Sequence, residues 1–563
     1  MYQIRESCIS CHHCELACPT QAVYYDGSKY GIAPDQCVEC GLCETLCPAC
    51  SIYDDAESLL PSPHERITRE CDLVVCGGGS GLVAAIKAGQ LGKKVILLEK
   101  AKCVGGNMNL ARAFFPAYSK LHADHGLEDV REEAVAKLSA LRDGAACNGL
   151  VHTAVYGCSE FTDWLLEFPG VYRQFSLDML GEETAGEVFG HAVLRLPARV
   201  ENKLSKDPFI GPGLMGSLVK KTMLEAIPSQ RLDVEILLEH EAVHLITDDA
   251  GTITGVVAKD PGGETEIICK AVILATGGFS ASDEKLRKFG FSNDARPPLR
   301  LTVPSNTGDA IDMLQELGVE PDIEHLLVST SGPSHRPFSY SLCHVFDYPA
   351  SLIVDCKGRC LMDESICPSN GAGKNRGSPV ETAWGIYTQQ NINDIMEGFI
   401  NNPSASGSYD NFAYYQEDLD RESGYKKPPV FKAETIEGLA GMLGVDPAAL
   451  KKAIEDYNCF CHSGHDPELN KIAEFLVPRE EGPYYAIYGQ LFSEFSAGGL
   501  KVDSKCRVLH NDSTHIPGLY ATGDATSAMR RSSEPSAVSG LSWALASAYR
   551  SAVESAKEME VSV

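Results

Sequence analysis

Eight cysteines near the start of the chain limit its fold more than any other feature of the sequence. They occur in two runs of the form C-x2-C-x2-C-x3-C-P: Cys8, Cys11, Cys14 and Cys18 before Pro19, and Cys37, Cys40, Cys43 and Cys47 before Pro48. Three closely spaced thiolates can bind one inorganic cube from a tight loop, whereas the fourth cysteine of such a run binds the other cube. The spacing therefore predicts two [4Fe–4S] clusters with crossed ligation, held by Cys8, Cys11, Cys14 and Cys47 and by Cys37, Cys40, Cys43 and Cys18.

Zinc is the alternative metal for a cysteine-rich segment. A structural zinc site uses four ligands, commonly in two separated pairs, and eight cysteines in two runs with trailing prolines fit that arrangement poorly. Residues 1–55 instead resemble the bacterial two-cluster ferredoxins. Cys50 and the cysteines after it lie outside the pattern, and we interpret them as small apolar residues or free thiols.

The length and charge of the chain limit how many domains and which kinds of partner it can have. A chain of 563 residues, 44% of them hydrophobic, exceeds one ordinary domain. A net charge of −28 argues against nucleic acid or an anionic membrane as the main partner. Residues 1–60 hold nine acidic and two basic side chains, which suits a basic redox partner. No apolar export segment or membrane span is evident, so we expect a cytoplasmic protein without a membrane span.

A second pattern begins beyond the connection Pro61-Ser62-Pro63-His64. Residues 72–76 (DLVVC) are typical of a buried strand, Gly77-Gly78-Gly79-Ser80-Gly81 of a tight turn, and residues 82–91 of a helix closed by Gly92. A strand over residues 94–98 follows, and Glu99 and Lys100 come after it, where an acidic side chain can bind a ribose. The segment predicts a dinucleotide-binding βαβ unit. Its glycine frame is ambiguous, since Gly77 and Gly79 leave Leu82 in the third place, whereas Gly78 and Gly81 put Cys76 in the first.

Four further segments support a dinucleotide site. Each follows an expected strand or opens an expected helix: Gly105-Gly106-Asn107, Ala275-Thr276-Gly277-Gly278, Asn306-Thr307-Gly308-Asp309-Ala310, and residues 518–525 with Gly523 and Asp524. In this order they resemble the flavoprotein subunits of fumarate reductase and succinate dehydrogenase, over roughly residues 70–563. The resemblance implies FAD, with Asp524 at the ribityl chain. It also implies a helix that starts near Ser536-Ala537-Val538 and points its N-terminus at the flavin.

The resemblance also implies the domain organisation. We expect an α/β protein in which a Rossmann-like FAD-binding domain (66–326 and 477–563) carries an inserted α+β capping domain (327–476). A small ferredoxin-like domain (1–60) precedes it. The membrane-bound relatives attach the flavin covalently to a histidine, but Gly106-Asn107-Met108-Asn109-Leu110 offers none, so we expect non-covalent FAD.

The expected catalytic residues depart from the family pattern. Residues 351–364 resemble the strand, turn and strand before the family's catalytic arginine, and Arg376 is our first candidate for proton donor, with a solvated loop arginine as the alternative. Ser493-Glu494-Phe495 replaces a substrate-histidine segment. Arg530 or Arg531 could bind a substrate carboxylate or carbonyl, unless they pair with acidic neighbours.

The remaining substrate-side candidates are His335 and several aromatic residues. His335 lies near the place of a family substrate histidine, although a lone histidine is usually structural. Phe495, Tyr340, Tyr348 and Tyr485 favour a substrate larger or more apolar than fumarate, and core packing is the alternative for each of them.

These features together predict an FAD- and iron–sulfur-dependent oxidoreductase. The resemblance implies reduction of an activated C=C bond by hydride from flavin N5. Two alternatives stay open: a dehydrogenase of a steroid-like or acyl substrate, and an electron-transfer subunit of a larger complex. The expected partners are a small unsaturated substrate and an electron donor such as ferredoxin or an NAD(P)H-oxidising protein, with no nucleic acid.

Overall fold

The structure is a computed structural model of the chain. The residues that it describes are 2–5, 8, 14–15, 18, 20–25, 30–39, 43–44, 47, 49, 51–54, 66–111, 114, 116–141, 148–171, 176–179, 192–195, 215–289, 299–300, 302–331, 345, 348–361, 364, 383–401, 415–416, 419–420, 430–528 and 540–561.

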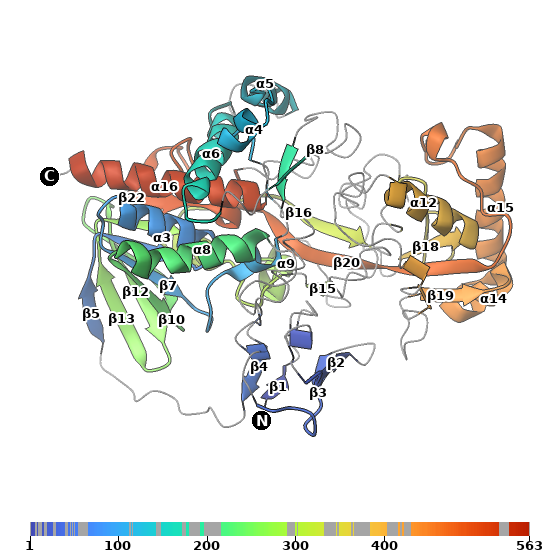
Figure 1. The fold of residues 1–563 in the computed structure, drawn as a ribbon, viewed down its shortest axis with the longest axis horizontal. Helices are drawn as coiled ribbons and strands as arrows, with labels where there is room; N and C mark the ends of the chain where they lie inside the picture. The colour runs from blue at the N-terminus through green and yellow to red at the C-terminus, as the bar shows by residue number, and fades with distance from the viewer. Residues whose placement is uncertain are drawn as a thin grey trace.

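The cysteine-rich segment forms a small module with two strand pairs. Strand β1 (Tyr2–Ile4) pairs antiparallel with β4 (Ile52–Asp54), and β2 (Val23–Tyr25) pairs antiparallel with β3 (Tyr30–Ile32). Figure 1 shows this module apart from the larger sheets, at the bottom of the view. Its ends are joined by the β1–β4 pair, so the module closes on itself within the first 54 residues.

A six-stranded sheet forms the centre of the chain that follows. Its order is β10-β7-β6-β14-β22-β21. The bounds are β6 Leu73–Cys76, β7 Val95–Glu99, β10 Val234–Leu238, β14 Ala271–Leu274, β22 His515–Ala521 and β21 Arg507–Leu509. All neighbours are parallel except β21 and β22. The strands expected at 72–76 and 94–98 are therefore confirmed to within one residue at each end.

The central strands are buried on both faces. Successive residues of β6 alternate between two hydrophobic clusters, Leu73 and Val75 in one and Val74 and Cys76 in the other, as the two-residue period of a strand requires. All four are fully buried. A continuous apolar run was therefore the right signal for a parallel strand covered on both sides.

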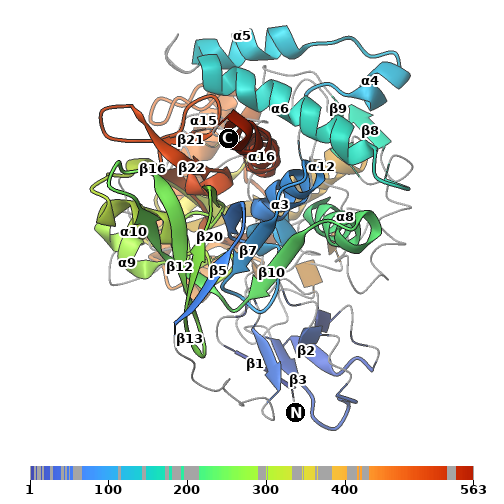
Figure 2. The ribbon, with the colours of Figure 1, turned by 90° about the vertical axis from the view of Figure 1, so that its left-hand side faces the viewer.

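Helices cover one face of this sheet and a second sheet covers the other (Figure 2). The helices on the sheet are α3 (Ser80–Gln90), α8 (Met215–Gln230) and α16 (Leu541–Val561), and α6 (Asn148–Leu166) packs on the outside of α16. The second sheet has the order β11-β12-β13-β5, with bounds β11 Glu241–Thr247, β12 Ile253–Asp260, β13 Gly263–Ile268 and β5 Ile67–Glu70. Because β5 pairs with β13, the chain leaving the cysteine-rich module enters this body directly.

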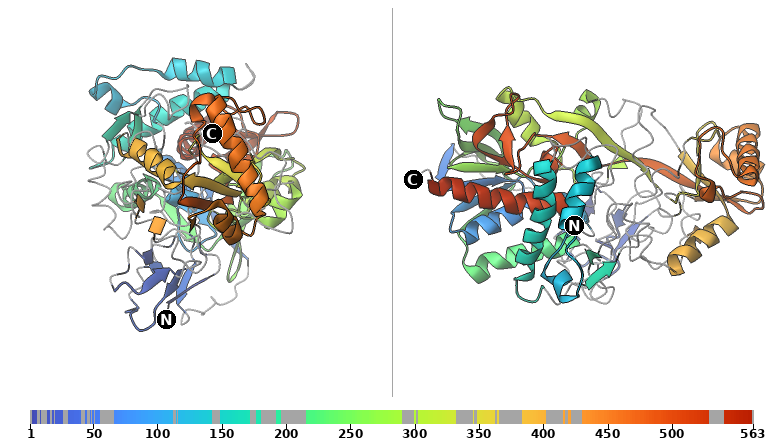
Figure 3. Two further views of the ribbon diagram at one scale, coloured as in Figure 1. Left: turned by 90° about the vertical axis from the view of Figure 1, so that its right-hand side faces the viewer. Right: turned by 90° about the horizontal axis from the view of Figure 1, so that it is seen from above.

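A third sheet extends away from the body. Its long strand β20 (Tyr484–Gly499) pairs with β18 (Ala383–Thr388) and β19 (Val430–Ala433) at one end. At the other end β20 pairs with β16 (Asp322–Ser331) and β15 (Leu299–Arg300). β17 (Leu352–Asp355) pairs with β18. Figure 1 and the right-hand view of Figure 3 show β20 running from the body to the far helices. The expected boundary at 326/327 falls inside β16.

The outer part of the third sheet, with its helices, corresponds to the expected capping domain. The helices are α12 (Gln389–Asn401), α14 (Ile436–Leu443) and α15 (Pro447–Ser463). Helix α15 begins at Pro447 with the Asp446 carboxylate accepting from the Ala448 N–H, and it ends at Ser463, before Gly464 with φ +69°. These signals are the usual start and stop of a helix.

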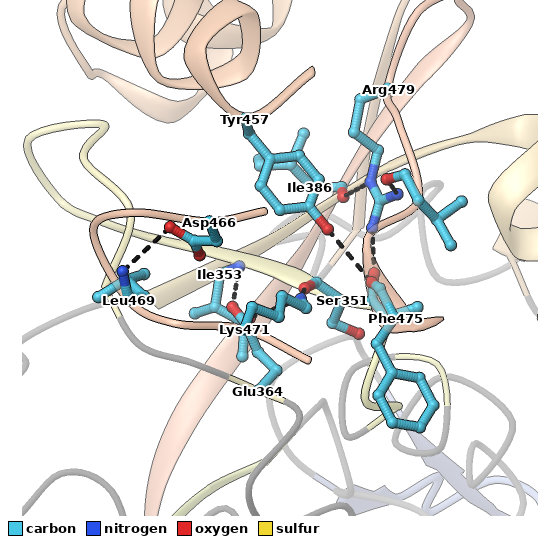
Figure 4. A network of polar contacts seen from close by, with 12 residues as sticks. Ser351, Ile353, Glu364, Ile386, Tyr457, Asp466, Leu469, Lys471, Phe475 and Arg479 are labelled. Atoms are coloured by element: carbon cyan, nitrogen blue, oxygen red, sulfur yellow. Dashed lines mark hydrogen bonds and ion pairs between the residues drawn. The ribbon is translucent and has the colours of Figure 1, made fainter. Parts of the chain in front are cut away.

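Charged side chains lie in the core of the capping domain (Figure 4). Lys471 donates to a Glu364 carboxylate oxygen at 2.8 Å and to the Ser351 carbonyl, and the other Glu364 oxygen accepts from the Ile353 N–H at 2.7 Å. The side chains of Lys471 and Glu364 are only 1% and 5% exposed. Arg479, also buried, donates to the carbonyls of Ile386, Val477 and Ala350. These bonds tie the turn after α15 to strands β17 and β18.

Further described strands and α-helices belong to the body. They are β8 Ser176–Met179, β9 Ala192–Arg195, α4 Lys120–Asp124, α5 Arg131–Leu141, α9 Asp283–Lys288 and α10 Asp309–Glu316. Within the described ranges, no helix combines the length and hydropathy needed to cross a bilayer.

Candidate functional site

The sequence segments expected to bind a dinucleotide meet at one edge of the central sheet. Strands β6, β7, β14 and β22 are parallel, and Gly77, Lys100, Ala275 and Thr522 follow their carboxyl ends directly. Ligands of open α/β sheets bind at this edge, where neighbouring strands leave in opposite directions. Segments separated by hundreds of residues are thus brought together by sheet topology.

The glycine turn after β6 resolves the ambiguity of the motif. Gly77 has φ +103°, and a Cβ there would lie 2.2 Å from the Ala275 carbonyl oxygen, so a side chain is excluded. A Cβ on Gly81 would meet Val75 Cγ1 at 2.8 Å, which is the close helix–strand packing of the third fingerprint glycine. The frame is therefore Cys76, Gly78 and Gly81, with Gly77 making the tight turn.

Glu99 holds this turn against the end of β7. Its carboxylate accepts from the Gly78 N–H and from the Ala101 N–H, both at 2.8 Å. Burial raises the pKa of Glu99, while the two N–H donors act in the opposite direction. A carboxylate has about four acceptor positions, so Glu99 keeps capacity for hydroxyl donors of a ribose.

Lys100 links β7 to the segment before α10. Its ammonium group lies 2.5 Å from the Thr307 hydroxyl and 2.8 Å from the Asp309 carboxylate. Gly308 precedes α10 with φ +81°, and the helix begins at Asp309. The segment Asn306–Ala310 was expected to open a helix, and this is confirmed.

A hydroxyl that the sequence did not single out joins three of the segments. Thr302 is fully buried, and its Oγ1 lies within 3.0 Å of side-chain atoms of Asn107, Ser280 and Asn306. The Asn107 amide oxygen also accepts from the Val303 N–H at 2.8 Å. The only signal in the sequence was the proximity of Thr302 to the Asn306 segment.

The last segment places Gly523 and Asp524 beside the glycine turn. The Gly523 N–H donates to Ser547 Oγ of α16 at 3.0 Å, and a Cβ on Gly523 would lie 3.2 Å from Ser80 Oγ. Asp524 is half-buried in the wall of the site. Helix α16 begins at Leu541, after Gly540 with φ +58°, because that backbone conformation does not continue into a right-handed helix. This start is later than the expected one, and Ser536, Ala537 and Val538 lie outside the described residues.

A cavity of ≈ 240 Å³, measured at the positions open to the centre of a water molecule, lies among these segments. The expected residues that line it are Gly77, Gly78, Gly79, Ser80, Glu99, Lys100, Gly106, Asn107, Ala275, Thr276, Gly277, Asp309 and Asp524. Asn306 and Thr522, from two of the expected segments, line it as well, and the lining residues that sequence reasoning missed include Leu98, Met108, Ala242, Val303, Ser305, Leu541 and Ala544. Gly81, Gly105, Gly278, Thr307, Gly308 and Gly523 were expected as well, and they belong to the surrounding helices and loops rather than to the wall.

The cavity suits the diphosphate and sugar of FAD. Helix α3 begins at its wall with no side-chain cap and no acidic residue in its first turn. Unpaired N–H groups at a helix N-terminus attract an anionic phosphate. Gly77–Gly79 have no side chains that would keep the diphosphate away from the backbone, and Glu99 and Asp524 supply acceptors for hydroxyl groups of the sugar and ribityl chain. The donor set is therefore that of a dinucleotide site.

The fourth cysteine of each motif accepts the same kind of hydrogen bond from a backbone N–H four residues further along the chain. Cys18 Sγ accepts from the Ala22 N–H and Cys47 Sγ from the Ser51 N–H, both at 3.2 Å. Burial alone would raise the pKa of the Cys18 thiol. Hydrogen bonds from the Thr20 hydroxyl and from nearby N–H groups lower it more strongly, so the pKa of Cys18 lies below its usual value. Such bonds favour the thiolate that an iron cluster needs. Cys8, Cys14, Cys18, Cys43 and Cys47 all contact one small core, and Cys37 is described as well. Cys11 and Cys40 lie outside the described residues.

The expected catalytic side chains are mostly beyond what the structure describes. Arg376, Arg530, Arg531, His335 and Tyr340 lie outside the described residues, as does the side chain of Phe495. Tyr485 is fully buried in the capping domain, and its hydroxyl donates to Gln389 Oε1 at 2.5 Å. Tyr348 packs against the same core. The structure thus gives Tyr485 a packing position in β20 instead of one in the cavity wall, because its side chain points into the capping core.

Two family models match the chain. One described as an FAD binding domain matches residues 72–539, and one described as a 4Fe-4S dicluster domain matches residues 7–50. The glycine turn, the cavity and the cysteine module were assigned to these two kinds of domain from the sequence, and the matches confirm both assignments.

Curated relatives and solved structures agree with the fold. Vinyl phenol reductase of Lactiplantibacillus plantarum is 27% identical over 478 residues, 80% of this chain and 89% of that protein. Urocanate reductase of Eggerthella lenta is 26% identical over 484 residues, 83% of this chain and 72% of that protein. A flavocytochrome c3 fumarate reductase structure has a TM-score of 0.62 at 21% identity, covering 87% of this chain and 79% of that one. The α/β fold expected from the sequence is confirmed.

Proposed function

Because this chain belongs to the FAD-dependent fumarate reductase and succinate dehydrogenase flavoprotein family, we propose that it reduces a C=C bond activated by a neighbouring conjugated group. It is an FAD- and iron–sulfur-containing oxidoreductase with the iron–sulfur module at its N-terminal side. Vinyl phenol and urocanate, the compounds in the names of two relatives, each hold a C=C bond conjugated to an aromatic ring. We therefore propose an enoate or enone substrate that is larger or more apolar than fumarate.

The observation that carries the proposal is the uncapped N-terminus of α3 at a cavity walled by Glu99 and Asp524. When bound, the reduced form of FAD would supply a hydride, and the iron–sulfur clusters would supply the two single electrons that reduce it. In our proposal the first turn of α3 binds the diphosphate, Glu99 accepts from a ribose hydroxyl, and Asp524 accepts from the ribityl chain. No histidine is present in residues 106–110, so we propose that FAD is held without a covalent bond.

In this proposal the capping domain supplies the acid, and the second stretch of the FAD-binding domain supplies the substrate-binding cation. We propose Arg376 as the donor of a proton to the substrate α-carbon, and Arg530 or Arg531 as the group that binds its carbonyl or carboxylate oxygen. Support for Arg376 is its place after residues 351–364, which resemble the strand, turn and strand before the family's catalytic arginine. That arrangement begins with β17, where the Asp355 N–H bonds to the Arg359 carbonyl. An arginine stays charged at all working pH values, so its role as acid depends on immediate reprotonation.

For the module we propose two [4Fe–4S] clusters with crossed ligation, as the duplicated motif indicates. The matched N–H bonds to Cys18 and Cys47, the fourth cysteine of each run, support the internal symmetry that this ligation requires. We propose that a ferredoxin or an NAD(P)H-oxidising protein delivers the electrons.

The test is reoxidation of the protein after anaerobic reduction with dithionite. Its flavin absorbance is followed with fumarate, urocanate, cinnamate-type acids, vinyl phenols, enones and unsaturated steroids. We expect fast reoxidation by at least one conjugated alkene, with formation of the saturated product. Reoxidation by ferredoxin alone, with every alkene inert, would refute the proposal and favour an electron-transfer subunit.

Two arginine variants test the assignment of the acid. We expect Arg376→Gln to lose alkene reduction while the flavin is still reduced by dithionite. Arg359→Gln is the matched control, because Arg359 is exposed in the same domain and pairs with Asp355 at 2.7 Å. Equal activity of the two variants would remove Arg376 from the mechanism.

A further inference from the structure

The iron–sulfur module contacts the body beside one of its cluster-binding cysteines. Cys103 Sγ donates to the Cys47 carbonyl oxygen at 3.7 Å, a distance suited to the weak S–H donor. Cys103 lies in the loop after β7, and Cys47 is the fourth cysteine of the second run. By crossed ligation Cys47 belongs with Cys8, Cys11 and Cys14. This cysteine set is therefore next to the contact.

The same loop forms part of the FAD site on its other side. The Gly105 N–H donates to the Gly78 carbonyl at 2.8 Å. Val104 is buried so close to Gly78 that a Cβ on that glycine would meet Val104 Cγ1 at 2.8 Å. Gly106 lines the cavity. Three Cα steps separate Cys103 from Gly106, at most about 11 Å of chain. One short loop thus separates the Cys47 set from the cavity.

The other cysteine set is more exposed to solvent. In the set of Cys47, Cys14 and Cys47 are buried, with 7% and 8% of their surface exposed, and Cys8 is half-buried; in the other set none of the described cysteines, Cys18, Cys37 and Cys43, is more than half-buried. Val38, directly after Cys37, is 61% exposed, which is unusual for a large aliphatic side chain. Asp35 and Glu39 beside it are also exposed. The two sets therefore lie in different surroundings.

We propose that the module is docked in one orientation, with one cluster turned to the FAD loop and the other to solvent, and that Cys103 is a positioning residue of this dock. The inner set is Cys8, Cys11, Cys14 and Cys47, and the outer set is Cys18, Cys37, Cys40 and Cys43. The proposal rests on the proposed function in one respect, namely that the module binds two clusters. An external electron donor then meets the outer set first.

The orientation can be measured on the whole protein by electron paramagnetic resonance, without any substrate. Cys14→Ser and Cys43→Ser replace the third cysteine of each run, and each shifts the spectrum of one reduced cluster, which assigns the two signals. A soluble gadolinium chelate then broadens the more exposed signal. We expect stronger broadening for the signal assigned by Cys43→Ser. Equal broadening, or stronger broadening for the signal assigned by Cys14→Ser, would overturn the orientation.

The role of Cys103 is tested by Cys103→Arg, which places a bulky cation in the contact. The control is Cys356→Arg, because Cys356 is exposed in a turn of the capping domain. With FAD content unchanged, we expect a gain of gadolinium broadening at the inner signal in Cys103→Arg and none in the control. An unchanged inner signal would show that Cys103 does not position the module. If Cys103→Arg fails to fold, the comparison of the two signals in the unaltered protein still decides the orientation.

The outcomes separate this inference from the proposed function. Two cluster signals with reversed exposure would overturn the docking and leave alkene reduction untouched. If every alkene is inert but the two signals show the expected exposure, alkene reduction is overturned and the docking stands. A single cluster signal would overturn both the docking and the two-cluster proposal.

Discussion

Replacing Lys471 by methionine should strongly destabilise the capping domain, because it leaves a buried carboxylate without its cation. The change removes the cation that lies 2.8 Å from Glu364, whose side chain is 5% exposed, and among the described residues it leaves that carboxylate hydrogen-bonded to the Ile353 N–H. Removing one member of a buried ion pair typically costs about 3–5 kcal/mol, because the other charge stays out of water. The Ser351 carbonyl also loses a donor. We therefore expect a loss of this size in the free energy of opening of the domain.

Hydrogen exchange followed by mass spectrometry on peptides of β17 and β18 measures that free energy locally. The double variant Glu364→Gln/Lys471→Met removes both charges and keeps an acceptor for the Ile353 N–H, so it should be more stable than Lys471→Met alone. Lys451→Met is the control, because Lys451 forms a solvent-exposed ion pair with Glu437. If Lys471→Met changes exchange no more than Lys451→Met, the pair does not hold the domain together.

Three predictions concern the cavity. Gly77→Ala should lower FAD content, because φ +103° alone costs an L-residue roughly 1–2 kcal/mol and the Ala275 carbonyl would clash with the new methyl group; the flavin-to-protein absorbance ratio measures it. FAD affinity should fall as pH decreases through the raised pKa of Glu99, since the protonated carboxyl loses acceptor capacity, and Glu99→Gln should flatten that dependence in a fluorescence titration. Lys100→Met should weaken FAD binding by freeing the Asp309 segment, and unchanged affinity would contradict this.

The parts of the fold that follow from local rules could be predicted from the sequence. The apolar run of β6, the glycine turn and the helix ending before Gly92, which has φ +76°, were read correctly to within one or two residues. Each depends on neighbours along the chain, namely burial on both faces of a strand and the conformational freedom of glycine.

The parts that depend on distant partners could not be predicted. Lys471 and Glu364 are 107 positions apart, and Asn107 and Thr302 are 195 apart, so nothing local marks either pair as buried partners. Tyr485 was expected near the substrate because aromatic residues are common in pockets. Which face of β20 it occupies is set by the register with β18, where Tyr485 stands opposite Tyr387.

The placement of the cavity residues along the chain has a consequence for the order of synthesis. The cysteine-rich module pairs β1 with β4 and can close once its first 54 residues have left the ribosome. The cavity is different, because β14 must pair with β22 and Leu541 and Ala544 complete its wall. Since chains grow at roughly 5–20 residues per second, the module has time to fold well before the cavity is complete. Newly made chains should therefore be able to acquire iron and sulfur before they can hold FAD.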